Sequence, residues 1–393
     1  MLLFNTLKLI QFLSFLNIIH SLNPESIQSF KDICLSNNYS FESHQVTTSD
    51  GYILTLFRIP NKVNESYSPN KPIVFLQHGL IDLAETWITN IPCHGFLLSD
   101  SGFDVWFGNS RGSYHSLGHK TLNSTKDPEY WQFTWQHMAE FDIPASVSYI
   151  LNLTKKPKLA YIGHSQGTLI MFALLAMDPK FIENLSIFIA LAPVGIVREL
   201  DVPMFKILKK NPVLAMAEKY GIYELLPNKQ QNEAFYEFCA KKINPCEKIV
   251  DFLAGMKVED DNKERFPIIM AHEPGGTSVM NMMHWQQMTN YKENKVQNFD
   301  YGEEINIRVY GKSQPPVYDF TKIPGPIAIF SAKKDRLADV EDVKWLVGIL
   351  SEGTVVVNRE LENFGHQTFL WGNEKAMEYF DEVIRVIEEF EKV

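Results

Sequence analysis

The sequence predicts an α/β fold: helices flank a mostly parallel central sheet, and a largely helical insertion precedes the last strands. Between residues 41 and 195, short apolar runs alternate with helical patterns, which is typical of strand–helix–strand crossovers. From about Val197 to Gln314 helical patterns rich in Met, Phe and Tyr take over, and the strand pattern resumes at Ile327. A chain of 393 residues, 45% of them hydrophobic, is long enough to bury a sizeable core.

Each expected strand is a short apolar run that ends near Gly, Asn or Pro. The runs are residues 53–59, 73–77, 103–107, 159–162, 187–191, 327–330 and 354–357. Residues 168–177 are strongly helical, and an amphipathic pattern predicts a closing helix over residues 374–390. The chain therefore divides into a core formed by residues 23–196 and 315–393 and an inserted cap or lid at residues 197–314.

The first 22 residues predict a secretory signal peptide. Their apolar stretch carries one charge, Lys8, and is interrupted by Gln11, Ser14 and Asn17, so it is too short and too polar to favour a membrane-spanning helix. The alternative is an amphipathic first helix of the fold. Since no later segment reaches spanning length, we expect no transmembrane segment after the signal is removed.

Two further features fit a secretory route. Five Asn-X-Ser/Thr sites are candidates for N-glycosylation: Asn38, Asn64, Asn123, Asn152 and Asn184. The four cysteines permit disulfides but require none. On a continuous helix Cys239 and Cys246 would lie about 10 Å apart, too far to bond, but Pro245 can break that helix. A disulfide between them and two free buried thiols both stay open.

The charge balance argues against a nucleic-acid partner. Lys and Arg total 37 against 47 Asp and Glu, which gives a formal charge of −10, and the chain has no Lys/Arg-rich block. The 11 histidines would offset nearly all of this charge if they were protonated. The surface would therefore approach neutrality in an acidic compartment.

A G-x-S-x-G motif marks the candidate nucleophile. Residues 163–167 read Gly-His-Ser-Gln-Gly, directly after the apolar run LAYI and before the helical run TLIMFALLAM. In this strand–turn–helix context a tight elbow lifts the serine hydroxyl above the sheet, and Gly163 and Gly167 allow the backbones to approach closely. We expect Ser165 to be the nucleophile.

A serine needs a neutral imidazole as base and a carboxylate that fixes the tautomer of that ring. The acid should follow a late strand, where Asp335 and Asp339 compete. Asp339 directly precedes a helical pattern, with Asp342 three residues later, which suits a helix cap. We therefore assign Asp335 as the acid. His366 is the single histidine downstream of it, so chain order selects His366 as the base.

Ester hydrolysis also needs two N–H donors for the tetrahedral oxyanion. The backbone of Gln166, next to the nucleophile, is one candidate, and Leu80, after Gly79 in an early strand–loop junction, is the other. His115 and His119 have a spacing that can bind metal on a helix, but Gly118 argues against a helix there. We predict neither a metal nor a cofactor.

The motifs together resemble those of the gastric and lysosomal acid lipases of the α/β-hydrolase superfamily. The matching stretches are VTTSDGYILTLFRIP (46–60), FLQHGL, DVWFGNSRG (104–112), FDIPASVSYIL, YIGHSQGT, GTSVMNMMHW (276–285), PPVYD, KDRLADVEDV and GHQTFLWG (365–372). They cover nearly all of the mature chain and are far more specific than the elbow alone.

This resemblance implies the same site: Ser165, Asp335 and His366 as a triad, with oxyanion donors at Leu80 and Gln166. It also implies an α/β-hydrolase fold with a lid, a Cys239–Cys246 disulfide, and triacylglycerol or sterol-ester substrates in gastric or lysosomal settings. The sequence departs from the family in one place, because His366-Gln-Thr-Phe replaces the usual His-x-Asp-Phe. The missing carboxylate bears on the pH optimum more than on catalysis.

We therefore predict a secreted or lysosomal serine lipase that hydrolyses neutral lipid esters through an acyl-enzyme, at an oil–water or membrane interface. A small-ester or thioester hydrolase on the same fold is the alternative within enzymes. A catalytically silent lipid-binding protein is the alternative outside them. The Met-rich run at residues 280–288 either contacts lipid or is plain core.

Overall fold

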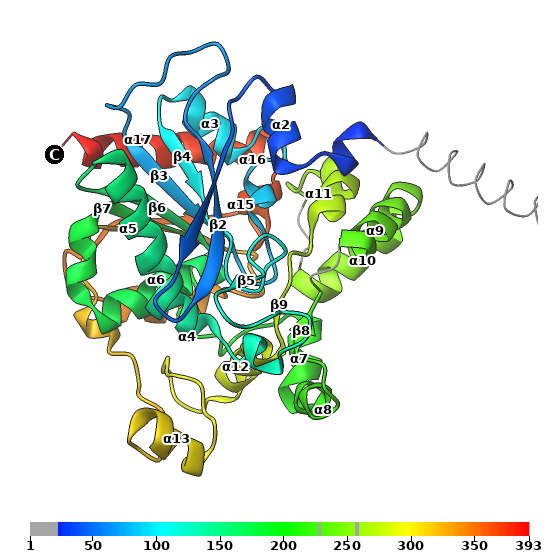
Figure 1. Ribbon diagram of the computed structural model, residues 1–393, viewed down its shortest axis with the longest axis vertical. Helices are drawn as coiled ribbons and strands as arrows, with labels where there is room; N and C mark the ends of the chain where they lie inside the picture. The colour runs from blue at the N-terminus through cyan, green and yellow to red at the C-terminus, as the bar shows by residue number, and fades with distance from the viewer. Residues whose placement is uncertain (1–22, 227–228, 256–258, 393) are drawn as a thin grey trace, which may run out of the picture.

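The computed structural model describes residues 23–226, 229–255 and 259–392, so the predicted signal peptide lies outside the described residues. A nine-stranded sheet forms the centre, in the order β1-β2-β4-β3-β6-β7-β10-β11, with β5 paired to β2 (Figure 1). Pairs from β4 through β11 are parallel and those of β2 are antiparallel. The predicted α/β-hydrolase fold with a mostly parallel sheet is confirmed.

The strands coincide with the expected apolar runs, except that the sequence did not predict the short strand β5 and that two strands at the edges of the sheet differ. Their bounds are β1 Glu42–Thr47, β2 Tyr52–Ile59, β3 Ile73–Gln77, β4 Asp104–Phe107, β5 Gly118–His119, β6 Leu159–His164, β7 Leu185–Leu191, β10 Ile327–Ala332 and β11 Val355–Leu361. The polar strand β1 was not expected, and β11 continues past the expected end at Val357. Both are edge strands with exposed positions, so their sequences need not be apolar.

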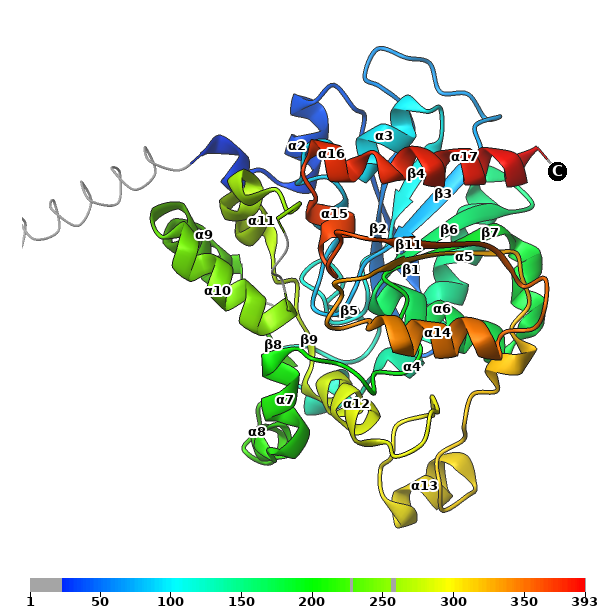
Figure 2. The same cartoon turned by 180° about the vertical axis from the view of Figure 1, so that it is seen from behind.

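Helices cover both faces of the sheet. One face packs against α2 (Phe30–Ser36), α3 (His94–Asp100) and the C-terminal helices, and the other against α5 (Ile143–Thr154), α6 (Gln166–Met177) and α14 (Val340–Ile349) (Figure 2). The closing helix expected over residues 374–390 is divided into α16 Glu374–Met377 and α17 Tyr379–Glu391, and a short helix, α15 Thr368–Trp371, precedes it. Glu378 interrupts the helix but keeps helical dihedral angles, so the hydrogen-bond pattern breaks while the chain direction is maintained.

The stretch expected to form the cap is mostly helical. Its helices are α7 Pro203–Lys210, α8 Val213–Lys219, α9 Lys229–Lys241, α10 Ile243–Ala254, α11 Phe266–His272, α12 Val279–Asn290 and α13 Glu303–Tyr310. A small antiparallel ladder joins β8 (Glu224–Leu225) to β9 (Thr277–Ser278). The Met-rich run forms α12, where Met280, Met282 and Met288 are buried, so most of it is core.

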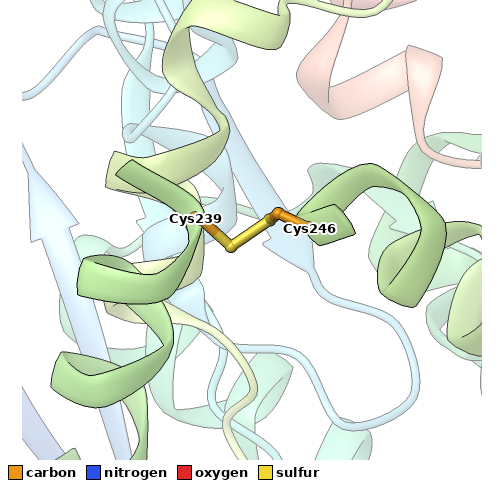
Figure 3. Close-up of a disulfide and its surroundings, with 2 residues drawn as sticks. All are labelled: Cys239 and Cys246. Carbon is orange, nitrogen blue, oxygen red and sulfur yellow. A yellow bond between two sulfur atoms is a disulfide. The ribbon is translucent and has the colours of Figure 1, made fainter. Parts of the chain in front are cut away.

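Cys239 and Cys246 form a disulfide between α9 and α10 (Figure 3). Their Cα atoms are 5.0 Å apart because the helix stops at Lys241 and restarts at Ile243. The interruption falls at Lys242, three residues before Pro245, which lies in the first turn of α10 where its missing N–H costs no hydrogen bond. Cys34 and Cys93 are free and buried.

Within the described ranges, no helix is both long enough and apolar enough to cross a membrane.

Candidate active site

The turn between β6 and α6 holds Ser165 in a strained backbone conformation, with φ 53° and ψ −119°. The flanking residues must be glycines because a side chain at either position would collide with neighbouring backbone. A Cβ on Gly163 would lie 2.6 Å from the carbonyl oxygen of Gly167, and a Cβ on Gly167 would lie 2.4 Å from that of Gln77. The elbow therefore forms only because β6, α6 and the end of β3 approach without side chains between them.

The structure brings together the three side chains named from the motif and chain order. His366 Nε2 lies 2.8 Å from Ser165 Oγ, and His366 Nδ1 lies 2.8 Å from Asp335 Oδ2. Asp335 follows β10 and His366 follows β11, so all three extend from the carboxyl edge of the sheet. All three are buried. The other Asp335 oxygen accepts N–H bonds from Leu337 and Ala338, which fixes the carboxylate plane.

The competing acid, Asp339, has another partner. It caps α14, where its Oδ1 accepts the Glu341 N–H at 2.8 Å. Asp342 does not complete the expected reciprocal cap, because its carboxylate accepts the Glu199 N–H at 3.0 Å. Burial raises the pKa of Asp342 to about 6. These two carboxyls thus fix the start of α14 and the chain that leaves β7.

The two expected oxyanion donors belong to segments that border the serine. Gly79, next to Leu80, packs so tightly that a Cβ there would lie 3.1 Å from Ser165 Cβ, and Gln166 follows the serine directly. His78 holds this loop, since its Nδ1–H donates to the Gly79 carbonyl at 2.8 Å and its Nε2 accepts the Ser110 N–H at 3.0 Å. Burial lowers the pKa of His78, consistent with this neutral tautomer.

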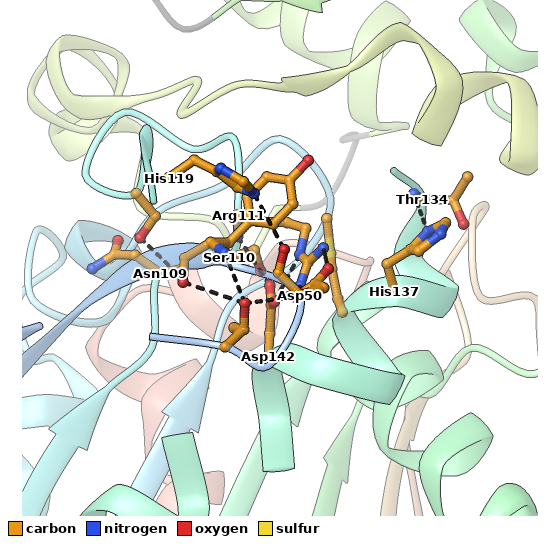
Figure 4. Close-up of polar contacts among 12 residues, drawn as sticks. Asp50, Asn109, Ser110, Arg111, His119, Thr134, His137 and Asp142 are labelled. Carbon is orange, nitrogen blue, oxygen red and sulfur yellow. Dashed lines mark hydrogen bonds and ion pairs between the residues drawn. The ribbon is translucent and has the colours of Figure 1, made fainter. Parts of the chain in front are cut away.

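A buried ion cluster, not anticipated from the sequence, supports that loop (Figure 4). Arg111 is fully buried between Asp50 and Asp142, with contacts of 2.6 Å and 2.7 Å, and its guanidinium lies 4.0 Å from the Tyr52 ring centre. Although burial alone would raise the pKa of Asp50, the guanidinium outweighs it and lowers that pKa. Arg111 directly follows Ser110, so the cluster anchors the residue that hydrogen-bonds His78.

Helix α12 is joined directly to the residue after the nucleophile. Gln166 Oε1 accepts hydrogen bonds from Trp285 Nε1 at 2.7 Å and from Asn281 Nδ2 at 3.1 Å. All three side chains are buried. The sequence offers no signal for this contact, because the partners are more than a hundred residues apart.

The loop of His366 is fixed from two sides. His164 Nε2 donates to the His366 carbonyl at 3.0 Å, and burial lowers the pKa of His164, which keeps that ring neutral. Thr368 Oγ1 accepts the Gly365 N–H and donates to Asp261 Oδ1 at 2.6 Å. Asp261, from the segment before α11, thus places a carboxylate beside Thr368, the position where the resemblance expects an aspartate.

An apolar cavity of about 240 Å³ lies beside Leu80 and extends below the helices of residues 197–314. Three polar residues also line it: Asp82, Glu273 and Gln367. The apolar lining residues are Leu80, Ile81, Met204, Leu208, Leu214, Leu225, Leu226, Phe235, Val250, Leu253, Ala254, Met270, Pro274, Met282 and Trp371. Its lining includes Leu80, beside the loop that packs on Ser165, and Gln367, which follows His366, and its apolar character suits an acyl chain.

The two histidines with metal-like spacing and the candidate glycosylation sites lie outside the triad. His115 forms a 2.6 Å ion pair with Glu85, and His119 contacts the Asp50 carbonyl, so the two histidines have separate partners. The sequon asparagines Asn38, Asn64, Asn123 and Asn152 are exposed, whereas Asn184 is half-buried and donates to the Phe181 carbonyl.

Known proteins show the same fold and the same family. Family models described as the partial α/β-hydrolase lipase region and the α/β-hydrolase fold match residues 30–91 and 72–195. A solved structure from Sulfolobus solfataricus superposes with a TM-score of 0.61, over 94% of this chain and 98% of the other. Its 15% identity limits that likeness to the fold. The fold and these matches define a protein of the α/β-hydrolase class, and the relatives below make it a lipase, a carboxylic ester hydrolase.

The curated relatives identify the family. The chain is 36% identical to gastric triacylglycerol lipase of Bos taurus, over 94% of each chain. It is 35% identical to human lysosomal acid lipase/cholesteryl ester hydrolase and to lipase lipl-1 of Caenorhabditis elegans, each over 94% of this chain and 93% of the relative. The chain belongs to the acid lipase family.

Proposed function

We propose that this protein is a serine lipase that hydrolyses neutral lipid esters through an acyl-enzyme on Ser165. The observation that carries the proposal is the continuous contact Asp335–His366–Ser165, with 2.8 Å at each step. A buried carboxylate on Nδ1 leaves Nε2 free to accept the serine proton, which is the arrangement that activates a hydroxyl.

In the proposed reaction His366 Nε2 takes the proton of Ser165 as its Oγ attacks the ester carbonyl. The Leu80 and Gln166 amides then stabilise the oxyanion, and His366 returns the proton to the leaving alcohol. Water, activated by the same imidazole, releases the fatty acid and restores the serine. His366 must be neutral for the first step, because only the neutral imidazole can accept the serine proton.

The substrate class is inferred from the cavity and from the relatives. The cavity wall beside Leu80 is almost entirely apolar, which suits a long acyl chain. Gastric triacylglycerol lipase and lysosomal acid lipase/cholesteryl ester hydrolase are named for triacylglycerols and cholesteryl esters. We propose that this protein hydrolyses esters of both classes.

Residues 197–314 are proposed to form the cap, with α7 and α8 as the part that meets the lipid surface. Five large apolar side chains in and after these helices are exposed: Ile207, Val213, Met216, Tyr220 and Ile222. Their neighbours Leu208 and Leu214 line the cavity, so one helix pair borders both solvent and the cavity. Exposed apolar groups of this kind mark interaction sites, here an oil–water or membrane interface.

A secretory route fits the gastric and lysosomal relatives. The disulfide and the four exposed sequons are typical of proteins that mature in an oxidising, glycosylating compartment. We propose that the mature protein is secreted or delivered to an acidic organelle.

An activity panel tests the proposal: triolein, cholesteryl oleate, tributyrin and p-nitrophenyl acetate at acid and neutral pH, with Ser165→Ala as the matched variant. We expect hydrolysis of the long-chain esters by the parent and less than about one per cent of it in the variant. Turnover of the short esters alone would indicate the small-ester or thioester hydrolase. A folded parent that hydrolyses none of them would indicate a lipid-binding protein.

A further inference from the structure

Two carboxyl groups meet behind the proposed oxyanion loop. Asp82 follows Leu80 by two residues, and Glu273 follows the end of α11; each is 5% exposed. Both side chains line the same apolar cavity, where Asp82 acts on Glu273 through its charge and through a side-chain hydrogen bond. The two carboxyl groups are thus enclosed between the loop that carries Leu80 and the segment that follows α11.

Two ionised carboxylates can only accept hydrogen bonds, so contact between them requires a proton on one. Glu273 is the group that holds it. Its Oε1 is buried and has no hydrogen-bond partner among the described residues, so an ionised Glu273 would be left uncompensated. Burial foremost, then the charges of Asp82 and Glu85, raise the pKa of Glu273 well above its ordinary value.

The charged groups around the pair are engaged elsewhere. Glu85 forms an ion pair with His115, and burial lowers the pKa of His78, so His78 is neutral. On α11, His272 Nε2 contacts the Glu25 carbonyl at 3.1 Å. At the start of the same helix, Arg265 pairs with the Glu25 carboxylate at 2.6 Å. None of these contacts provides Glu273 with a counter-ion.

The segment that carries Glu273 is joined to the loop that carries Leu80. Gly275 N–H donates to the Ile81 carbonyl at 2.7 Å, and a Cβ on Gly275 would lie 2.6 Å from the Asp82 carbonyl oxygen. Ile81 has a φ of 56°, a conformation that a β-branched residue keeps only when its surroundings hold it. The backbone of Leu80 therefore depends on the contact between these two segments.

We propose that Glu273, protonated and hydrogen-bonded to Asp82, is a positioning residue that holds the Leu80 N–H in place, and that loss of this proton sets the alkaline limit of activity. The inference rests on the proposed function, in which Leu80 is an oxyanion donor. Above that limit two adjacent negative charges repel each other and separate the loop from the 273–275 segment.

The sign of the stability effect follows from the direction of the shift. A glutamate whose pKa is higher in the folded than in the unfolded state stays protonated in the fold after the unfolded chain has lost its proton. The free energy of unfolding then falls as pH rises from the ordinary glutamate value to the raised one. An amide at this position removes that fall.

The test is the pH profile of kcat/KM on p-nitrophenyl butyrate for the parent and for Glu273→Gln, whose amide donates to Asp82 at every pH. We expect acid-side activity within a few-fold of the parent and an alkaline limb moved upward, so that activity above the parent's limit increases about tenfold per pH unit of movement. The matched control is Glu391→Gln, another partly buried glutamate of raised pKa, remote from the site, which should keep the parent profile.

If kcat/KM falls at the same alkaline pH in the parent and in Glu273→Gln, the inference is overturned. If Glu273→Gln does not fold, Asp82→Asn makes the same test, because its amide can donate to Glu273. The pH dependence of urea unfolding is a readout independent of catalysis: the parent should lose stability toward alkaline pH more steeply than the variant, and equal slopes would also contradict the inference. A parent that is inactive at every pH refutes the proposed function itself.

Discussion

Helix α12 and the pair α7–α8 belong to the same stretch between β7 and β10, yet they are packed in opposite ways. Trp285 of α12 is completely buried and hydrogen-bonds Gln166, the residue after the proposed nucleophile. In and after α8, Met216 is 49% exposed and Tyr220 75% exposed. α12 is therefore fixed against Gln166, a proposed oxyanion donor, and α7–α8 are the part proposed to face lipid.

The contrast indicates that a helical insertion need not act as one unit. The hydrogen bonds of α12 to Gln166 link it to the residue after the proposed nucleophile, so disturbing it should change the chemical step. The exposed apolar side chains of α7–α8, Ile207, Val213 and Met216, contact solvent, so disturbing them should change only how a long substrate is held.

The largest effect is expected at the proposed acid. Asp335→Asn should reduce kcat by about four orders of magnitude, because an amide favours the wrong imidazole tautomer. Asp339→Asn should leave kcat within a few-fold, since Asn is also a good helix cap. Steady-state hydrolysis of p-nitrophenyl butyrate checks both, and the reverse ranking would show that the acid is Asp339.

The next effect concerns the hydrogen bond between α12 and Gln166. Trp285→Phe removes the N–H donor and keeps an aromatic ring, so we expect kcat on soluble esters to fall about tenfold, equivalent to about 1.4 kcal/mol. The matched control is Gln286→Ala on the same helix, since Gln286 donates to the carbonyls of Leu208 and Asn211 and so faces α7–α8. A control that loses as much soluble-ester activity as Trp285→Phe would contradict the division within the stretch.

A smaller, substrate-dependent effect is expected at α8. Met216→Ser with Tyr220→Ser should lower activity on emulsified triolein several-fold and leave p-nitrophenyl acetate hydrolysis unchanged, because only the first substrate has to be taken from an interface. The measurement is the ratio of the two rates. The same ratio in the folded variant and in the parent would remove α8 from the lipid-binding surface.

The smallest effect on chemistry is expected at the disulfide. Cys239→Ser with Cys246→Ser opens a short loop in α9–α10, which should cost about 2 kcal/mol of local stability and leave soluble-ester activity unchanged. Limited proteolysis should then cut the variant within residues 235–255 faster than the parent. Equal cleavage rates would mean that the disulfide does not stabilise this helix pair.

The parts of the fold that sequence could predict are those where burial controls composition. The central strands β3, β6, β7 and β10 are buried along their whole length, so they read as apolar runs. Strand β1 alternates exposed and half-buried positions at the sheet edge and gave no such run. The break at Glu378 within the closing helix also left the amphipathic pattern intact and could not be predicted.

The residues of the candidate site also fall into those that the sequence could identify and those that it could not. Ser165, Asp335 and His366 could be named because each follows a recognisable strand and chain order restricts the choice. The Arg111 cluster, the Gln166–Trp285 bond and the Asp82–Glu273 pair could not, because their partners are distant in sequence and meet only through tertiary packing. No local pattern identifies a buried polar contact of that kind.

Ser165 as the nucleophile is the central assignment, and covalent labelling tests it directly. Incubating the native protein with a fluorophosphonate probe, followed by intact-mass measurement and peptide mapping, should give a single adduct on the peptide that contains Ser165. The adduct should be absent from Ser165→Ala and form much more slowly in Asp335→Asn. A parent that hydrolyses esters but carries the adduct on another residue, or carries none, would contradict the account.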